Sequence, residues 1–293
     1  GGHMIEGFRG HVLGDRNELA VAFVMTLPIC FYLLGQYKEY SRIMWFGLLG
    51  TMALLATAVV GTQSRGGFIA LAGIGLYLFA KSERKLPMAI MGTILIVGLS
   101  QIVSSDWTER MNTIDTAEND ASFMGRVVAW KLSFILAMKN PIFGGGFKSL
   151  EYFPVWAELS REFYSYTWFY TGDALPPTTF SRAAHSIYFQ VMGEHGFVGL
   201  AIFLSLLATS FLKAGRLARK ARKAGAPAWI ASLATMLQLS VFAFALGGAA
   251  LSFAYFELYY AIIGLLIVLE LRILPSVLKE SVPPSATPSL ASK

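Results

Sequence analysis

Long runs without a charged residue dominate this sequence and constrain its fold more than any other feature. Such runs cover 19–37, 43–64, 66–80, 86–105 and 224–256. A membrane-spanning helix needs about 20 mostly apolar residues, and the chain is 55% hydrophobic and only 14% charged. Because a soluble protein needs more charge to solvate its surface, the sequence predicts an all-α fold: a polytopic bundle of transmembrane helices.

We expect seven spans in this chain. The fifth is too long for one straight span, so we expect it to stand partly out of the hydrocarbon or to bend at Gly193 or Gly196. The predicted spans are 18–36, 43–61, 66–81, 86–104, 185–212, 227–246 and 250–271. The predicted divisions are 1–104 with spans one to four, an external loop domain at 105–184, spans five to seven within 185–274, and a disordered cytoplasmic tail at 275–293.

The basic residues of the short loops predict the orientation of these spans. Loops 213–223, 81–85 and 36–42 carry an excess of Lys and Arg, which favours the cytoplasmic side. The segment 105–184 and the N-terminus then lie outside, which indicates that this chain is the C-terminal part of a longer protein. The net charge of +6 is accounted for by topology and contact with anionic lipid, and not by a nucleic-acid partner.

The external segment contains one predicted amphipathic helix, at 123–139. Ser122 or Asp120 is the expected N-cap, and Asn140-Pro141 is the expected stop. Apolar side chains follow helical spacing, while basic ones fall elsewhere, so the helix should lie at the outer interface or dock on the bundle. The apolar positions are Val127, Trp130, Phe134, Ile135 and Met138, and the basic ones are Arg126, Lys131 and Lys139.

Two further features of this segment leave alternatives open. Gly144-Gly145-Gly146 allows close backbone approach to a ligand, but a flexible turn is the better explanation for three glycines alone. The aromatic stretch 151–170 fits an interfacial belt or a lid whose rings stack on sugars.

Two arginines near the outer surface are candidate anion-binding residues. Arg65 lies between two apolar runs and is followed by two glycines, where a guanidinium is costly unless it is paired or faces a ligand; the alternative is a snorkelling anchor. Arg126 begins the predicted loop helix, where a guanidinium and free backbone N–H groups would converge on an anion. An exposed Arg on an amphipathic face is the simpler explanation for Arg126 alone.

Further ionisable residues lie at the start of the fifth span and in the last spans. His185 could act as a general base on a hydroxyl, with Arg182 alongside it, or be an interfacial His without a role. Glu257 is expected seven residues inside the last span, about 10 Å deep. A carboxylate at this depth indicates a functional role, and pairing with Arg65 explains its presence equally well. Glu194 and His195 are also near membrane depth.

Metal and nucleotide chemistry is not indicated. Four His and the single Cys30 show no metal-ligand spacing, and no Walker A or GxGxxG motif is present. We therefore expect a metal-independent protein without a cofactor.

The order of several short motifs resembles the O-antigen ligase/polymerase superfamily. These are Asn-Glu-Leu-Ala at 17–20, Ser-Arg-Gly-Gly at 64–67, a long outer loop with Gly125-Arg126 and Asn-Pro-Ile-Phe-Gly-Gly-Gly at 140–146, and His-Ser-Ile-Tyr at 185–188 followed by Gly-Glu-His-Gly-Phe-Val-Gly-Leu at 193–200. The resemblance covers nearly all of 10–272 and is greatest to the O-glycosylation ligases associated with exosortase systems. It implies the C-terminal portion of a GT-C-like, metal-independent glycosyltransferase of the bacterial inner membrane, with its active site facing the periplasm.

The resemblance also implies roles for individual residues. Arg65 and Arg126 would bind the diphosphate of an undecaprenyl-diphosphate-linked glycan, and His185 would activate the acceptor hydroxyl. Asn17 would shape the cavity. Arg16 stands where relatives often have Pro, so it is either a further phosphate contact or an interface charge. We also expect Arg182 and Glu257 to contact substrate.

Together these expectations define a ligase that transfers a glycan to a glycan, lipid or protein acceptor with inversion at the anomeric carbon. The nearest alternative is a polymerase of the same superfamily. A transporter or flippase of lipid-linked sugars and a non-catalytic assembly subunit are the alternatives from other classes.

Overall fold

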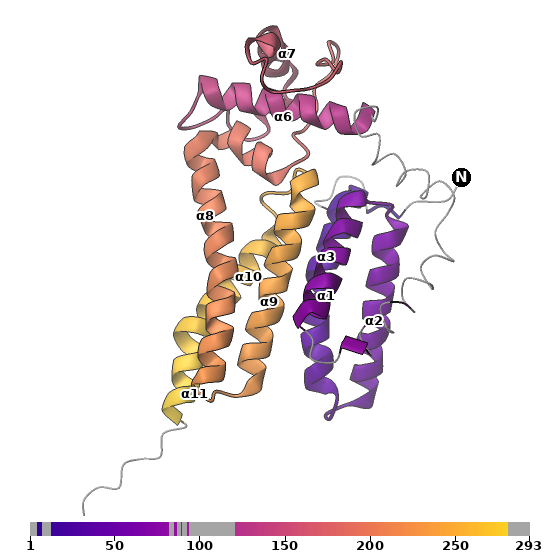
Figure 1. The fold of residues 1–293 in the computed structure, drawn as a ribbon, viewed down its shortest axis with the longest axis vertical. Helices are drawn as coiled ribbons and strands as arrows, with labels where there is room; N and C mark the ends of the chain where they lie inside the picture. The colour runs from indigo at the N-terminus through magenta and orange to yellow at the C-terminus, as the bar shows by residue number, and fades with distance from the viewer. Residues whose placement is uncertain are drawn as a thin grey trace, which may run out of the picture.

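The fold is a bundle of long helices capped at one end by a helix that lies across it (Figure 1). The structure is a computed structural model that describes residues 5–7, 13–81, 85–86, 89, 93 and 121–280. Within these residues the regular elements are all helical. The α-helices are α1 (Arg16–Tyr37), α2 (Arg42–Gly61), α3 (Arg65–Lys81), α6 (Ala121–Lys139), α7 (Phe153–Arg161), α8 (Ile187–Lys223), α9 (Ala228–Gly247), α10 (Glu257–Val268) and α11 (Leu274–Glu280).

Short helical turns connect several of these elements. Three are 3-10 turns, and a π-helical turn joins α10 to α11. They are η2 (Ser149–Glu151), η3 (Phe163–Ser165), η4 (Gly248–Ala250) and η5 (Leu269–Ile273).

Among the described residues, five helical stretches are long and apolar enough to cross a membrane, and α3 is a shorter apolar helix over Arg65–Ala80. The chain is thus an all-α, multi-pass membrane protein, as its apolar runs predict. Most of the predicted fourth span, 86–104, lies outside the described residues. The five stretches are Arg16–Tyr37, Arg42–Gly61, Ile187–Lys223, Ala228–Ala250 and Glu257–Glu280.

Small residues let three of the spanning helices approach closely. A Cβ on Gly67 of α3 would come within 2.5 Å of the Ala20 side chain of α1, and one on Gly247 of α9 within 2.6 Å of Val21. Lower in the bundle, the buried Ser240 hydroxyl of α9 donates to the Met25 carbonyl of α1 at 2.7 Å. Small residues and interhelical hydrogen bonds of this kind hold helices together in lipid, so α1 packs closely against both α3 and α9.

Two of the last spans differ from their predicted extents. Residues 213–223 are not a loop but the last turns of α8, because Lys, Arg and Ala are strong helix formers. The last span does not begin at residue 250: residues 251–256 are non-helical, and α10 begins at Glu257. Residues 275–280, predicted as disordered tail, continue the helix as α11.

The cap is formed by α6, with α7 above it (Figure 1). It stands at the end of the bundle opposite the basic C-terminal turns of α8. α6 docks on the bundle, since a Cβ on Gly193 of α8 would lie 3.2 Å from the Ser133 side chain of α6. The helix begins at Ala121, so the prediction of Ser122 as its N-cap is wrong, and Asp120 lies outside the described residues.

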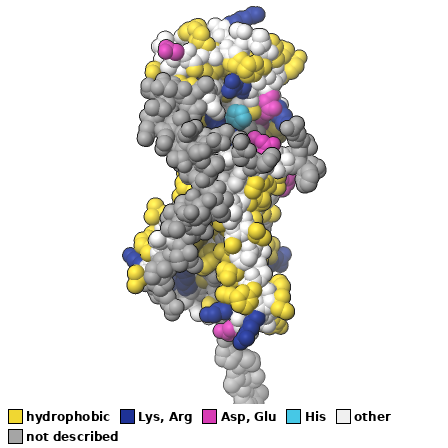
Figure 2. Space-filling model, turned by 90° about the vertical axis from the view of Figure 1, so that its right-hand side faces the viewer, with side chains coloured by type: hydrophobic (Ala, Val, Ile, Leu, Met, Phe, Trp, Pro, Cys, Tyr) yellow, Lys and Arg dark blue, Asp and Glu magenta, His cyan; other side chains and the backbone are white. Residues whose placement is uncertain are grey.

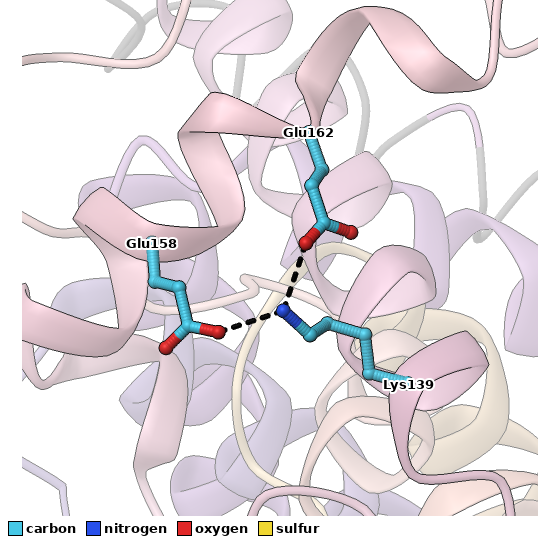
Figure 3. Close-up of polar contacts among 3 residues, drawn as sticks. All are labelled: Lys139, Glu158 and Glu162. Atoms are coloured by element: carbon cyan, nitrogen blue, oxygen red, sulfur yellow. Dashed lines mark hydrogen bonds and ion pairs between the residues drawn. The ribbon is translucent and has the colours of Figure 1, made fainter.

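The side chains of α6 are buried on two sides, because the bundle lies below it and α7 with the following aromatic segment lies above. Lys131 is therefore only 4% exposed, although the spacing placed it on the polar face. Its ammonium donates to the Phe169 carbonyl at 3.2 Å and lies 4.3 Å from the centre of the Phe163 ring. At the end of α6, Lys139 bridges Glu158 and Glu162 at 2.7 and 2.8 Å and so ties α7 to the cap (Figure 3).

Candidate functional site

Charged side chains from four separate segments meet where the cap covers the bundle. The first turn of α1, the segment 148–151, Arg126 of α6 and residues 182–185 before α8 all contribute. Figure 2 shows acidic, basic and histidine side chains gathered on the surface just below the cap. This mouth is the candidate site.

His185 is the central side chain of this mouth. Its backbone adopts a left-handed conformation (φ 48°), and its N–H donates to the Ser252 hydroxyl at 2.7 Å. Burial lowers the pKa of the imidazole; the charges of Arg126 and Arg182 lower it further, while Asp15 acts in the opposite direction. A half-buried imidazole with a lowered pKa is neutral at neutral pH and can accept a proton.

Two arginines stand beside this imidazole. The guanidinium of Arg182 packs over Gly125, where an added Cβ would come within 2.5 Å of Nη1, and it lies 5.2 Å from the Phe180 ring. Gly125 thus makes room for Arg182 directly beside Arg126. The Nε of Arg182 is buried and makes no hydrogen bond to the described residues. Two neighbouring guanidinium groups suit a multiply charged anion such as a diphosphate.

Arg65 lies at the same end of the bundle, as the first residue of α3. A tight turn presents it: Gln63 is left-handed (φ 53°), and the buried Ser64 hydroxyl accepts from the Gly67 N–H at 3.2 Å. Gly66 packs against η4, since a Cβ on this glycine would lie 3.6 Å from the Ala250 side chain. Because η4 leads to Ser252, one short segment contacts Gly66, the neighbour of Arg65, and also accepts the hydrogen bond of the His185 N–H.

The first turn of α1 supplies acidic groups that the sequence did not single out. Asp15 caps α1, and its Oδ1 accepts from the Asn17 backbone N–H at 2.7 Å and from Asn17 Nδ2 at 2.8 Å. Asn17 thus holds Asp15 in place, the carboxylate whose charge acts on His185. Arg16 is the half-buried first residue of α1. Glu18 interacts electrostatically with Asp15, Lys148 and Glu151.

Glu257 is not placed as the sequence predicted. It is the exposed first residue of α10 and is not about 10 Å inside the span. The reason is the non-helical segment 251–256, which postpones the helix by seven residues relative to the predicted start at 250. This segment instead carries Ser252 and Tyr255 to the mouth, and neither was expected to take part.

The three consecutive glycines form a docked turn rather than a flexible one. The predicted bend in the fifth span is confirmed at Gly196, where φ is 68° and ψ is −168° and the helix is broken. The turn supplies hydrogen-bond partners to backbone groups at the break in α8. The N–H groups of Gly145 and Gly146 donate to the carbonyls of Gly193 and Glu194, each at 2.9 Å, and the Phe197 N–H donates to the Pro141 carbonyl at 2.8 Å. Backbone groups freed by a helix break need such partners.

Aromatic side chains cover the cap side of the mouth. Trp130 of α6 stacks on Phe189 of α8 with ring centres 5.1 Å apart, and Phe134 meets Trp168 edge-on at 5.2 Å. Trp156 is fully buried and donates to the Pro177 carbonyl at 3.0 Å. Trp168 remains 68% exposed, so the segment after α7 is partly a packed wall and partly an open aromatic surface.

The helical bundle and this mouth define a class: a multi-pass membrane protein with two arginines beside a half-buried histidine at one end of the bundle. The family model described as O-Antigen ligase matches residues 50–204. This range is more than half of the chain and includes Arg65, Arg126, Arg182 and His185. The chain belongs to the O-antigen ligase family, and is thus a membrane enzyme of the ligase and polymerase class. No curated protein sequence matches the chain.

Within the part of the chain that the structure describes, no group of three or more His, Cys, Asp or Glu side chains is arranged to hold a metal ion. Cys30 is buried in α1, away from the mouth.

Proposed function

We propose that this protein is a ligase that transfers a glycan from undecaprenyl diphosphate to an acceptor hydroxyl at the periplasmic face of the bacterial inner membrane. The observation that carries the proposal is the electrostatic setting of His185, which is buried beside Arg126 and Arg182. This arrangement keeps the base neutral and places positive charge beside the leaving group, which carries negative charge.

In this reaction the acceptor oxygen attacks the anomeric carbon while the bond from that carbon to the diphosphate oxygen breaks. His185 takes the proton of the acceptor hydroxyl, and the electron pair of the broken bond leaves with undecaprenyl diphosphate. Arg126, Arg182 and Arg65 neutralise the charge that grows on the diphosphate. A single displacement of this kind inverts the anomeric carbon.

The acidic side of the mouth supports the same division of roles. Asp15 favours the protonated imidazole that forms when His185 accepts the proton, whereas the two arginines oppose it. Once the diphosphate is bound, its negative charge offsets the two arginines, so the imidazolium becomes less costly in the complex than in the free enzyme. Donor binding would thus prepare the base.

The proposal is tested with the protein reconstituted in liposomes, a lipid-linked glycan and an acceptor, followed by mass spectrometry of the products. His185→Ala and Arg126→Ala should abolish transfer while leaving expression intact. Arg216→Ala, which removes an exposed arginine from the opposite end of α8, is the matched control and should transfer normally.

Full activity of His185→Ala would remove the assignment of the base. Product ladders in place of a single ligated species would identify a polymerase. Movement of the lipid-linked glycan across the bilayer without release of free undecaprenyl diphosphate would identify a transporter and reject the ligase.

A further inference from the structure

A buried carboxylate at the break of α8 joins three segments that surround the mouth. Glu194 is 5% exposed. Its Oε1 accepts from the Lys148 backbone N–H at 3.0 Å and from Gln190 Nε2 at 3.4 Å, and its Oε2 accepts from the Tyr255 hydroxyl at 2.5 Å. These donors belong to the glycine-rich turn, to α8 and to the non-helical segment 251–256. A buried carboxylate is stable only with such partners.

Two side chains of α8 hold the segment 251–256 by hydrogen bonds. Besides the contact of Tyr255 with Glu194, the Ala254 N–H donates to the Gln190 Oε1 at 3.1 Å. Gln190 is itself hydrogen-bonded to Glu194. The position of the segment therefore depends on the Glu194 carboxylate both directly and through Gln190.

This segment in turn holds His185. The Ser252 hydroxyl accepts from the His185 N–H at 2.7 Å, and His185 has a left-handed backbone (φ 48°). A residue other than glycine keeps this conformation only where its surroundings impose it. Ser252 is the partner that the structure gives to this strained backbone, so the imidazole follows the position of the segment.

The space between these groups is nearly filled. A cavity of about 10 Å³ lies among residues that include Glu194, Gln190, Ser252 and Lys148, and this is room for about one water molecule. Closely packed groups transmit a displacement instead of absorbing it. A shift at Glu194 is thus expected to reach Ser252.

We propose that Glu194 is a positioning residue for the transfer reaction, which sets the placement of His185 through Tyr255, Gln190 and Ser252 without touching substrate. The inference rests on the proposed function, since it concerns the base of that reaction. Its role is geometric: the carboxylate locks the segment 251–256 and the glycine-rich turn to the broken end of α8.

The hydrogen-bond directions show which substitution should preserve this lock. The Tyr255 hydroxyl has one proton, which it gives to Glu194, so the contact of 2.9 Å between Tyr255 and His195 Nε2 requires His195 to donate. In Glu194→Gln the amide oxygen keeps both N–H donors. The amide N–H₂ would donate to Tyr255, which would then give its proton to His195. The same atoms stay in contact with the directions reversed.

The experiment compares Glu194→Ala, Glu194→Gln and Tyr255→Phe in the liposome transfer assay, with kcat and the donor KM measured separately. Glu194→Ala should lower kcat by on the order of 100-fold, the loss that a displacement of about 1 Å produces, while the donor KM stays nearly unchanged. Glu194→Gln should restore most of kcat. Tyr255→Phe should lower kcat, whereas its matched control Tyr259→Phe, which removes another tyrosine hydroxyl, beside Ser210, should not.

A double-substitution cycle with Ser252→Ala separates positioning from general damage. If both residues act through His185, the combined loss in kcat should be clearly smaller than the product of the single losses. Wild-type kcat in Glu194→Ala, an equal loss in Glu194→Gln, or independent losses in the cycle would each overturn the inference. Full activity of His185→Ala would instead overturn the proposed function, so the two failures are distinguishable.

Discussion

The replacement of Gly196 by Ala should both destabilise the protein and inactivate it. Gly196 has φ 68° and ψ −168°, a region that is essentially restricted to glycine and costs about 1–3 kcal/mol for other residues. A Cβ there would also lie 2.5 Å from the Pro141 carbonyl oxygen, which is the acceptor of the Phe197 N–H at 2.8 Å. Loss of that hydrogen bond adds about 1 kcal/mol, so we expect a total of about 3 kcal/mol.

The measurement is the thermal unfolding of the detergent-solubilised protein, followed by the transfer assay on the same preparations. Gly264→Ala is the control, because Gly264 lies within α10 and nothing lies within 4 Å of its Cβ position. Alanine favours a helix by up to about 1 kcal/mol over glycine, so the control should melt no lower than the wild type. If Gly196→Ala melts with the wild type and retains activity, the docked turn is not required for the fold or the site.

Three further predictions concern charges. The activity should persist below a pH of about 6.5, the ordinary pKa of histidine, because burial and the two arginines lower the pKa of His185. The Asp15 carboxylate raises that pKa, so in Asp15→Asn the acid limb of the pH–rate profile should move to lower pH. Lys131→Met should leave the melting temperature unchanged or raise it, because burial lowers the pKa of this ammonium and replacing a buried charge removes that cost. The wild type should also gain stability relative to Lys131→Met as the pH rises through this lowered pKa towards the ordinary pKa of lysine, about 10.4. A lower melting temperature for the variant at neutral pH would contradict the reasoning. Lys139→Ala should loosen α7, which would appear as faster proteolysis within 153–165 than in the wild type. The difference in proteolysis rate should shrink at high salt because Glu158 is exposed. A difference that does not depend on salt would show that packing, not charge, holds α7.

The sequence predicts the helices well, because hydropathy and helix signals are local properties. The starts of α1, α2, α3 and α9 lie within two residues of the predicted spans, and the cap helix α6 ends at Lys139 as expected. The errors fall at 213–223, where a basic sequence without a hydropathy signal is strongly helix-forming, and at 251–256, where tertiary contacts override hydropathy. Residues 251–256 are apolar enough to extend a span, yet contacts with α8 hold them out of the helix.

The candidate site was predicted in part. Arg126, Arg182 and His185 were singled out, and the structure brings their charges together. Asp15, Ser252 and Tyr255 were missed, because each is an ordinary cap, loop or aromatic residue in the sequence and acquires its role only from a neighbour far along the chain. One sequence signal for this part of the site is the pair of glycine motifs at 144–146 and 193–196. These two motifs dock against each other, and their docking depends on the break in α8.

The sequence alone determined that this chain is a multi-pass helical membrane protein of the O-antigen ligase class, because the length and charge of its apolar runs and the order of its motifs are written in consecutive residues. The tertiary structure decided which side chains act on His185 and how its backbone is held. Several of those contacts join residues about 60 or more positions apart, such as Glu194 to Tyr255 and His185 to Ser252. No local pattern encodes them, since they depend on how the broken end of α8, the glycine-rich turn and the segment before α10 pack together.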